Sequence, residues 1–129
     1  MKPTVIIDTN ILLRYLRNDH PILSIKAKKI FEKGYKNSIN IYLDEIVLAE
    51  TIWVLSSHYK TPKSLIVSQL LKQLYFDWIV NPRKKLMIKA LGLFGKTNLS
   101  YIDCWIFTVN QSLKTFLETF DSYLKKLKI

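Results

Sequence analysis

Short apolar runs alternate along this chain with longer segments in which apolar residues recur every three or four positions. The short runs are rich in β-branched and aromatic residues, which is typical of strands in a parallel sheet. They predict four strands, at residues 4–7, 38–43, 75–80 and 114–118. The longer segments predict six helices, at residues 9–17, 21–33, 45–59, 63–74, 83–94 and 100–111. A short amphipathic helix is expected to follow Asp121.

Because predicted strands and helices alternate, the pattern favours an α/β sandwich with a mostly parallel central sheet. The length of 129 residues suits a single domain, residues 1–129. In such sheets, ligands bind in the crevice beyond the carboxyl ends of the strands. Residues that directly follow a strand are therefore the first candidates for a functional site.

The first ten residues place a carboxylate at such a strand end. The apolar residues 5–7 stop at Asp8, and Thr9 and Asn10 follow, either of which can cap a helix. We interpret this stretch as a buried strand, an acid at its carboxyl end and a helix that starts directly afterwards. A charge in that position is costly unless another group compensates it.

Two further acids lie among apolar residues in predicted helices. Glu50 has Ile46 and Trp53 as neighbours on its helical face, and Asp103 has Phe107 four positions later. Unpaired acidic residues are almost never fully buried. Both residues are therefore candidates for a site on the inner face of a helix.

Asp121 is the fourth candidate, because it lies just beyond the last predicted strand. Glu118 competes with it, but a residue after the strand can turn into the crevice. The remaining acids have loop, cap or solvated-face interpretations: Asp19, Glu32, Asp44, Glu45 and Asp77. Any one of the four selected acids, taken alone, is equally well explained by an ordinary salt bridge.

Four carboxylates brought together would need a counter-charge. Two carboxylates about 4 Å apart repel by roughly 4 kcal/mol at an effective dielectric constant of about 20. Carboxylate oxygens suit the hard cations Mg²⁺ and Mn²⁺. One cysteine and two widely separated histidines do not suit a structural zinc site. The sequence also contains no nucleophilic dyad in a suitable context, no glycine-rich phosphate loop and no hydrolase elbow.

The charge balance indicates a polyanionic partner. Twenty Lys and Arg face ten Asp and Glu, which gives a net charge of +10. A bias toward lysine in the composition is the alternative explanation. If the four selected acids occupy a pocket, six acids remain on the surface. Candidates for a basic rim are Arg14, Arg17, Lys26, Lys29, Arg83, Lys84, Lys85 and Lys89.

Composition also bears on location. No run of about 18 apolar residues is present, so we expect no membrane span. The chain begins almost directly with the first strand, which leaves no room for a signal peptide. The single cysteine, Cys104, excludes an intramolecular disulfide. These observations favour a cytoplasmic protein.

Both ends of the chain resemble the PIN-domain nucleases, particularly the small single-domain toxins of VapC type. Residues 7–12, Ile-Asp-Thr-Asn-Ile-Leu, resemble the opening motif of that family. Residues 116–124, which contain Thr119 and Asp121, resemble its closing strand and turn. Glu50 and Asp103 match the second and third acidic positions. The order of elements agrees over nearly the whole chain.

This resemblance implies a three-layer α/β/α sandwich with a four- to five-stranded sheet and a Mg²⁺- or Mn²⁺-dependent endoribonuclease activity. It implies that Asp8, Glu50 and Asp103 bind the metal, and that Asp121 binds it directly or through water. Thr9, Asn10 and Thr119 would be supporting polar groups, although capping and turn formation explain them equally well. The resemblance also implies a toxin of a type II toxin–antitoxin pair, with RNA as substrate, a cognate antitoxin as partner and a homodimeric assembly.

Two other functions fit parts of the pattern. A non-catalytic PIN-like module that binds RNA or protein would share the fold, but intact acidic positions argue against it. A receiver-type signalling domain also gathers acids at strand ends. It would need an aspartate after the third strand, where this chain has Val80, Asn81 and Pro82.

Overall fold

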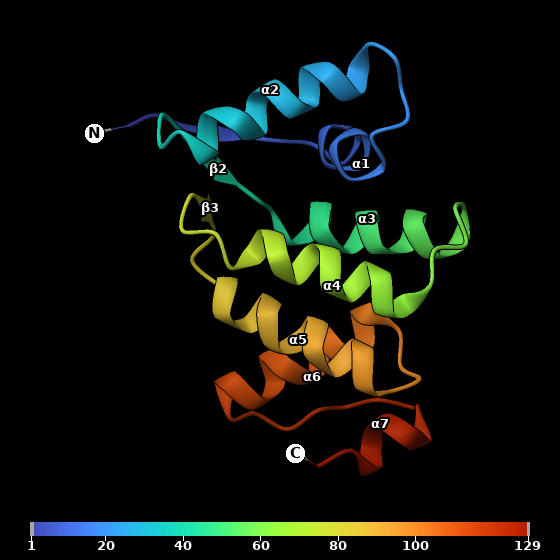
Figure 1. The fold of residues 1–129 in the computed structure, drawn as a ribbon. Helices are drawn as coiled ribbons and strands as arrows, with labels where there is room; N and C mark the ends of the chain where they lie inside the picture. The colour runs from blue at the N-terminus through green and yellow to red at the C-terminus, as the bar shows by residue number, and fades with distance from the viewer. Residues whose placement is uncertain (1, 129) are drawn as a thin grey trace. The chain divides into compact units, whose positions relative to one another are not determined.

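The computed structural model describes residues 2–128 (Figure 1). The chain forms two compact units. The first unit ends at Pro82 and the second begins at Arg83. All three strands assigned in the described residues belong to the first unit. Each unit has a core and a set of helices of its own, so the two are described in turn.

The first unit contains a parallel sheet of three short strands, β1 (Thr4–Ile6), β2 (Asn40–Tyr42) and β3 (Ile79–Val80), in the order β1-β2-β3. Val5 lies opposite Ile41, and Ile41 lies opposite Ile79. Since all strands run in the same direction, their carboxyl ends meet at one edge. This confirms the predicted α/β class with a parallel sheet.

Four helices accompany the sheet: α1 (Thr9–Arg17), α2 (Leu23–Tyr35), α3 (Glu45–Ser57) and α4 (Lys63–Leu74). Helix α1 packs against α2 and α3, while α4 packs against α3 and β3. The bounds of α4 are those expected from the sequence. The helices thus surround the strands and place the start of α1 directly after β1.

An aromatic cluster fills much of the core of the first unit. Tyr15 stacks on Phe31 with 3.8 Å between ring centroids, and Trp78 contacts Phe31 at 6.1 Å and Phe76 at 4.8 Å. Gly34 in α2 lies directly against the Trp78 ring, and a Cβ atom at this position would overlap it. Glycine is therefore needed at position 34 for close packing.

The second unit is helical in its described part, with α5 (Lys84–Lys96), α6 (Tyr101–Leu113) and the short α7 (Ser122–Lys126). Helices α5 and α6 are joined by four residues and pack along each other. Ser100 caps α6, because its hydroxyl accepts a hydrogen bond from the Asp103 N–H.

The helical pair in the second unit has a small apolar core. Met87, Leu91 and Cys104 are fully buried. Phe94 packs edge-on against Tyr101, with 6.1 Å between ring centroids. Cys104 forms no disulfide and is fully buried, and its Sγ lies 3.8 Å from Thr97 Oγ1.

The predicted strand at residues 114–118 is wrong. Lys114 ends α6 in a left-handed conformation, and the residues that follow are extended but join no β-ladder. Phe116 and Phe120 are 97% and 103% exposed. A strand forms only through hydrogen bonds to a neighbouring strand, and the described part of the second unit contains none. The sheet therefore has three strands in the described residues, not four to five.

The first strand is also less buried than expected. Thr4 is exposed, and the side chain of Ile6 is 69% exposed, whereas Ile7 just beyond the strand is buried. Thr4 and Ile6 alternate with Val5 and therefore share one face of β1, and that face is exposed. A β-branched run therefore predicted the strand correctly but not its burial.

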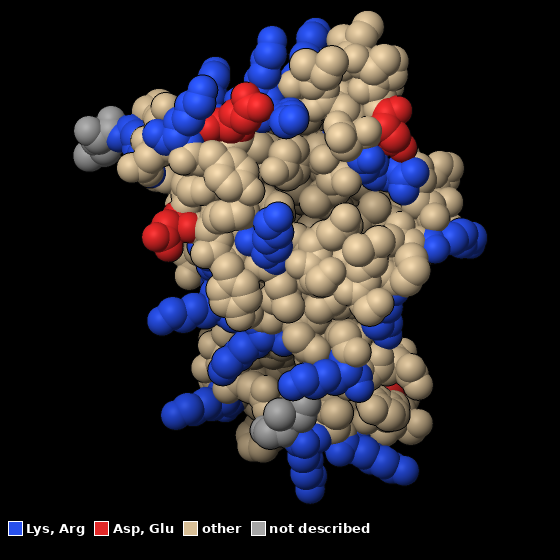
Figure 2. All heavy atoms as spheres, viewed as in Figure 1, with Lys and Arg blue, Asp and Glu red and all other residues tan. Residues whose placement is uncertain are grey.

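The surface is predominantly basic. Figure 2 shows one face of the molecule, on which Lys and Arg side chains are widespread and Asp and Glu side chains are sparse. This agrees with the net charge of +10. None of the helices within residues 2–128 is both long and apolar enough to cross a membrane.

Candidate active site

Asp8 is fixed by the start of α1. It follows the buried Ile7, and its Oδ1 accepts a hydrogen bond from the Ile11 N–H at 3.0 Å. Asp8 itself is therefore the N-cap, whereas the sequence favoured Thr9 or Asn10. Its side chain is exposed, so the expected cost of burying a charge does not apply. Capping, rather than burial, determines where this carboxylate lies.

Glu50 lies in α3 on an exposed side of the helix, which corrects the prediction of an inner face. Its neighbours Ile46 and Trp53 are 77% and 66% exposed. The buried side is instead formed by residues around Leu48 and Ile52. Because α3 carries apolar residues on both sides, helical periodicity alone does not identify the buried one.

The structure brings Asp8 and Glu50 to one cavity of about 480 Å³ within the first unit. Thr9 and Asn10 line the same cavity. The Thr9 hydroxyl donates a hydrogen bond to Glu50 Oε1, which links the start of α1 to the middle of α3. Two carboxylates and a hydroxyl group thus share a small open space beyond the end of β1.

Tyr59 also lines this cavity, and the basic side chain of Arg17 packs over its ring. The Arg17 guanidinium carbon is 3.8 Å from the centre of the Tyr59 ring. Arg17 Nε also donates to Asp19 Oδ2 at 3.0 Å. Sequence reasoning included Arg17 in the basic rim but missed Tyr59, because Tyr59 follows the end of α3 and no helical spacing links it to Glu50.

The other two predicted acids belong to the second unit, where each lies at the start of a helix. Asp103 is partly exposed in the first turn of α6. Asp121 is exposed and caps α7, since its Oδ1 accepts from the Leu124 N–H at 2.8 Å. Thr119 Oγ1 accepts from the Asp121 N–H at 3.1 Å, so Thr119 has the turn-forming role.

The donor atoms of the cavity suit a hard divalent cation. The carboxylates of Asp8 and Glu50 supply oxygen ligands of the kind that Mg²⁺ and Mn²⁺ prefer. Within neither unit, over residues 2–128, do three or more His, Cys, Asp or Glu side chains gather closely enough to hold a metal ion. The cavity therefore accounts for two of the four expected ligands, and the full set stays a prediction.

Comparison with protein families gives one result for this chain. The family model described as "PIN domain" matches residues 5–129, a range that includes both units. No match was found among curated proteins or among solved structures. The matched range also contains Asp8, Glu50, Asp103 and Asp121. The chain therefore belongs to the PIN domain family, whose members are generally nucleases.

Proposed function

We propose that this protein is a Mg²⁺- or Mn²⁺-dependent endoribonuclease that hydrolyses phosphodiester bonds in RNA. The observation that supports the proposal most is the cavity shared by Asp8 and Glu50. Membership of the PIN domain family supports the nuclease class. The net charge of +10 supports a polyanionic substrate.

Each residue of the cavity has a defined task in this proposal. Asp8 and Glu50 would hold the metal through carboxylate oxygens. The chemistry that a bound metal would supply there is polarisation of the phosphodiester and a lower pKa of the attacking water. The N-cap hydrogen bond to Ile11 keeps Asp8 at the start of α1, and a carboxylate has further lone pairs with which to bind a cation.

Thr9 acts on Glu50 rather than on the substrate. Its hydroxyl donates to Glu50 Oε1 and thereby restricts the rotation of that side chain. Partners of metal ligands commonly change metal affinity or activity by about 10- to 100-fold when they are removed. Thr9 is therefore a positioning residue in this mechanism.

Asp103 and Asp121 remain in the proposal because they match the third acidic position and the closing motif of the family. Both are at least partly exposed and carry no ion pair to Lys or Arg among the described interactions. Their assignment as metal ligands rests on sequence position. Substitution of each by asparagine tests it directly.

The resemblance to toxins of VapC type supports a more specific role. We propose that the protein is the toxin of a type II toxin–antitoxin pair, that a cognate antitoxin inhibits it, and that it forms a homodimer. Growth arrest on expression in a bacterial host, relieved by a small open reading frame that overlaps the gene, would support this role. Unimpaired growth of cells that contain active enzyme would contradict it.

The enzymatic proposal is tested with a panel of RNA substrates in the presence of Mg²⁺, Mn²⁺ or EDTA. Asp8→Asn and Glu50→Gln should each lose most of the cleavage seen with the unmodified protein. Asp77→Asn serves as the control, since Asp77 is an exposed acid of the same unit outside the cavity. Equal cleavage by Asp8→Asn and the unmodified protein would contradict the proposal, because a contaminating ribonuclease gives that result. RNA binding without metal and without turnover would favour a non-catalytic module.

A further inference from the structure

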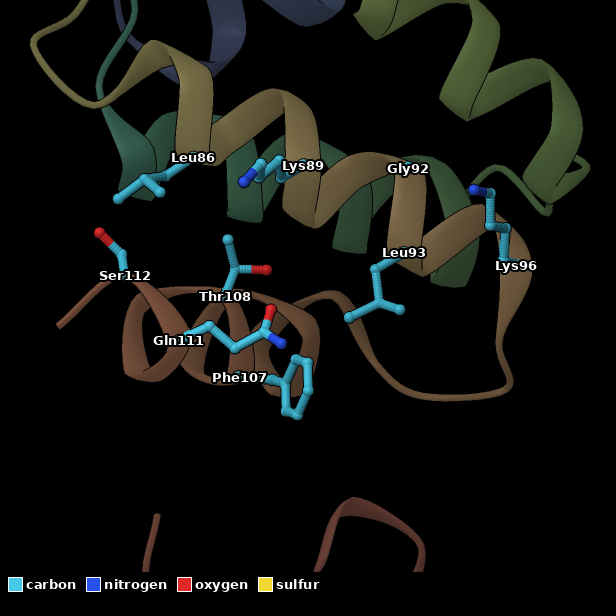
Figure 3. A pocket seen from close by; sticks show the side chains of 9 residues that line it. All are labelled: Leu86, Lys89, Gly92, Leu93, Lys96, Phe107, Thr108, Gln111 and Ser112. Carbon is cyan, nitrogen blue, oxygen red and sulfur yellow. The ribbon is translucent and has the colours of Figure 1, made fainter. Parts of the chain in front are cut away.

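Helices α5 and α6 of the second unit form the walls of an open cavity of about 600 Å³ (Figure 3). We name this cavity the α5–α6 groove. Helix α5 contributes Lys89, Gly92, Leu93 and Lys96 to its wall, and α6 contributes residues around Phe107. All of these residues belong to the second unit. The groove is therefore separate from the cavity that contains Asp8 and Glu50.

Gly92 forms an open part of this wall in the middle of α5. A Cβ atom at Gly92 would meet no other group within 4 Å, so packing within the structure does not require glycine there. Glycine in a helix interior is less stable than alanine. An open backbone position of this kind allows the backbone of another helix to approach closely.

Two lysines flank Gly92. Lys89 and Lys96 are seven residues apart, which places them two helical turns or about 10 Å from each other on one side of α5. Both are exposed, and none of the residues within 2–128 that line the groove is acidic. From Arg83 onward the chain carries nine Lys and Arg against three Asp and Glu. The complementary ligand is therefore acidic.

The lining of the groove favours a protein partner over RNA. Leu86 contributes a partly exposed apolar side chain, whereas Leu93 and Phe107 are only 7% and 6% exposed. Binding of single-stranded RNA relies on exposed aromatic rings against which bases stack. This groove offers no such ring face, whereas a leucine or isoleucine side chain fits an apolar wall of this kind.

We propose that the α5–α6 groove binds an acidic amphipathic helix from a partner protein. The helix crosses α5 at Gly92, packs apolar side chains against Leu86, and pairs two acidic residues with Lys89 and Lys96. This mode of recognition is the insertion of an amphipathic helix into a groove. It is independent of the catalytic proposal, because none of these residues belongs to the Asp8 cavity.

The test uses the full chain and a synthetic 18-residue helical peptide. The peptide carries leucine along one face and two glutamates seven positions apart, and a scrambled peptide of equal composition is the first control. Fluorescence anisotropy measures the dissociation constant. Gly92→Leu fills the floor of the groove, and Lys89→Glu and Lys96→Glu reverse its charge. Each should weaken binding about tenfold or more.

Two further variants separate binding from folding. Gly92→Ala should raise the melting temperature, because alanine favours the helix, and should still weaken binding of the peptide. Lys85→Glu is the charge control, since Lys85 is an exposed residue of α5 that does not line the groove. It should leave the dissociation constant within about twofold of the unmodified value.

Four results would overturn the proposal. These are absence of peptide binding at concentrations up to about 1 mM, equal binding of the scrambled peptide, and insensitivity to Gly92→Leu. The fourth is a different occupant. A 12-nucleotide RNA that displaces the peptide with the same dependence on Gly92 and Lys96 would identify nucleic acid. Self-association that Gly92→Leu abolishes, measured by sedimentation, would identify a second copy of the chain.

Discussion

Asp8 in the first unit and Asp121 in the second have the same local structure. Each follows an extended segment, and each caps a helix by accepting a hydrogen bond from the N–H three residues later, at 3.0 Å from Ile11 and 2.8 Å from Leu124. The difference lies in their surroundings. Within its unit, Asp8 shares a cavity with Glu50, whose orientation Thr9 controls. Helix capping thus explains where both carboxylates lie. The presence of a second carboxylate, Glu50, is what marks Asp8 as a candidate metal ligand.

The largest expected effect comes from replacing both caps by asparagine, which also caps helices well. Asp8→Asn should lower RNA cleavage by about 100-fold or more, because one metal ligand is lost. Asp121→Asn should lower it by about tenfold if Asp121 binds the metal through water. Cleavage rates at saturating Mn²⁺ and at limiting Mn²⁺ distinguish a loss of metal affinity from a loss of chemistry.

Alanine at the same positions provides the matched comparison. Asp8→Ala and Asp121→Ala lose the cap as well and should each lower the free energy of unfolding by about 1 kcal/mol. If Asp121→Asn cleaves RNA like the unmodified protein while Asp8→Asn does not, Asp121 is a cap alone. If both asparagine variants are fully active, the metal site proposed for Asp8 is wrong.

A smaller difference in stability is expected between Gly34 in α2 and Gly92 in α5, two of the three helical glycines. Gly34→Ala forces a methyl group against the Trp78 ring and should destabilise the protein by about 1–3 kcal/mol. Gly92→Ala meets open space and should stabilise it by about 0.5–1 kcal/mol. Urea unfolding of both variants measures the difference. If Gly34→Ala stabilised the protein as Gly92→Ala is expected to do, the close packing of Gly34 on Trp78 would be wrong.

The smallest expected effect is a loss of folding stability at alkaline pH that depends on Tyr15. Burial, together with the nearby Tyr35 and Glu32, raises the pKa of Tyr15 to about 12. Since the unfolded chain has a pKa near 10 at this side chain, the folded state retains its proton longer. The associated stability is complete below about pH 10 and is lost as the pH rises toward 12.

Tyr15→Phe checks this assignment. Chemical denaturation at pH 9 and at pH 11.5 should show a larger loss of stability for the unmodified protein than for the variant. At neutral pH the free energy of unfolding of the variant should be about 1 kcal/mol lower, because Tyr15 also has a hydrogen bond to Tyr35. An identical dependence on pH in both proteins would mean that Tyr15 titrates in the folded state as it does in the unfolded chain.

Local signals in the sequence were sufficient for most of the helices. Helix α4 begins at Lys63, just after Pro62, as its predicted range does, and α6 follows its N-cap Ser100, the residue at which that helix was predicted to begin. Such signals depend on residues within one helical turn, so they can be recognised without knowing how the rest of the chain folds. The position of Asp8 directly after β1 was predicted for the same reason.

Signals that depend on distant partners failed. Residues 114–118 have the composition of a strand, but a strand needs a neighbour that composition does not reveal. The exposed side of α3 around Glu50 was taken for a buried one, because Ile46 and Trp53 are apolar. Tyr59 lines the cavity because of the path that the chain takes after α3, and no periodic pattern in the sequence predicts that path.

The enclosed thiol of Cys104 has a practical consequence for chemical labelling. Thiol reagents react with accessible thiolates, and a fully buried cysteine is protected from them. A new cysteine at an exposed position, such as Ser112→Cys in the α5–α6 groove or Asn10→Cys beside Asp8, would therefore be the main site of modification. A fluorophore or spin label attached there would report on occupancy of the groove or the cavity in the otherwise native protein.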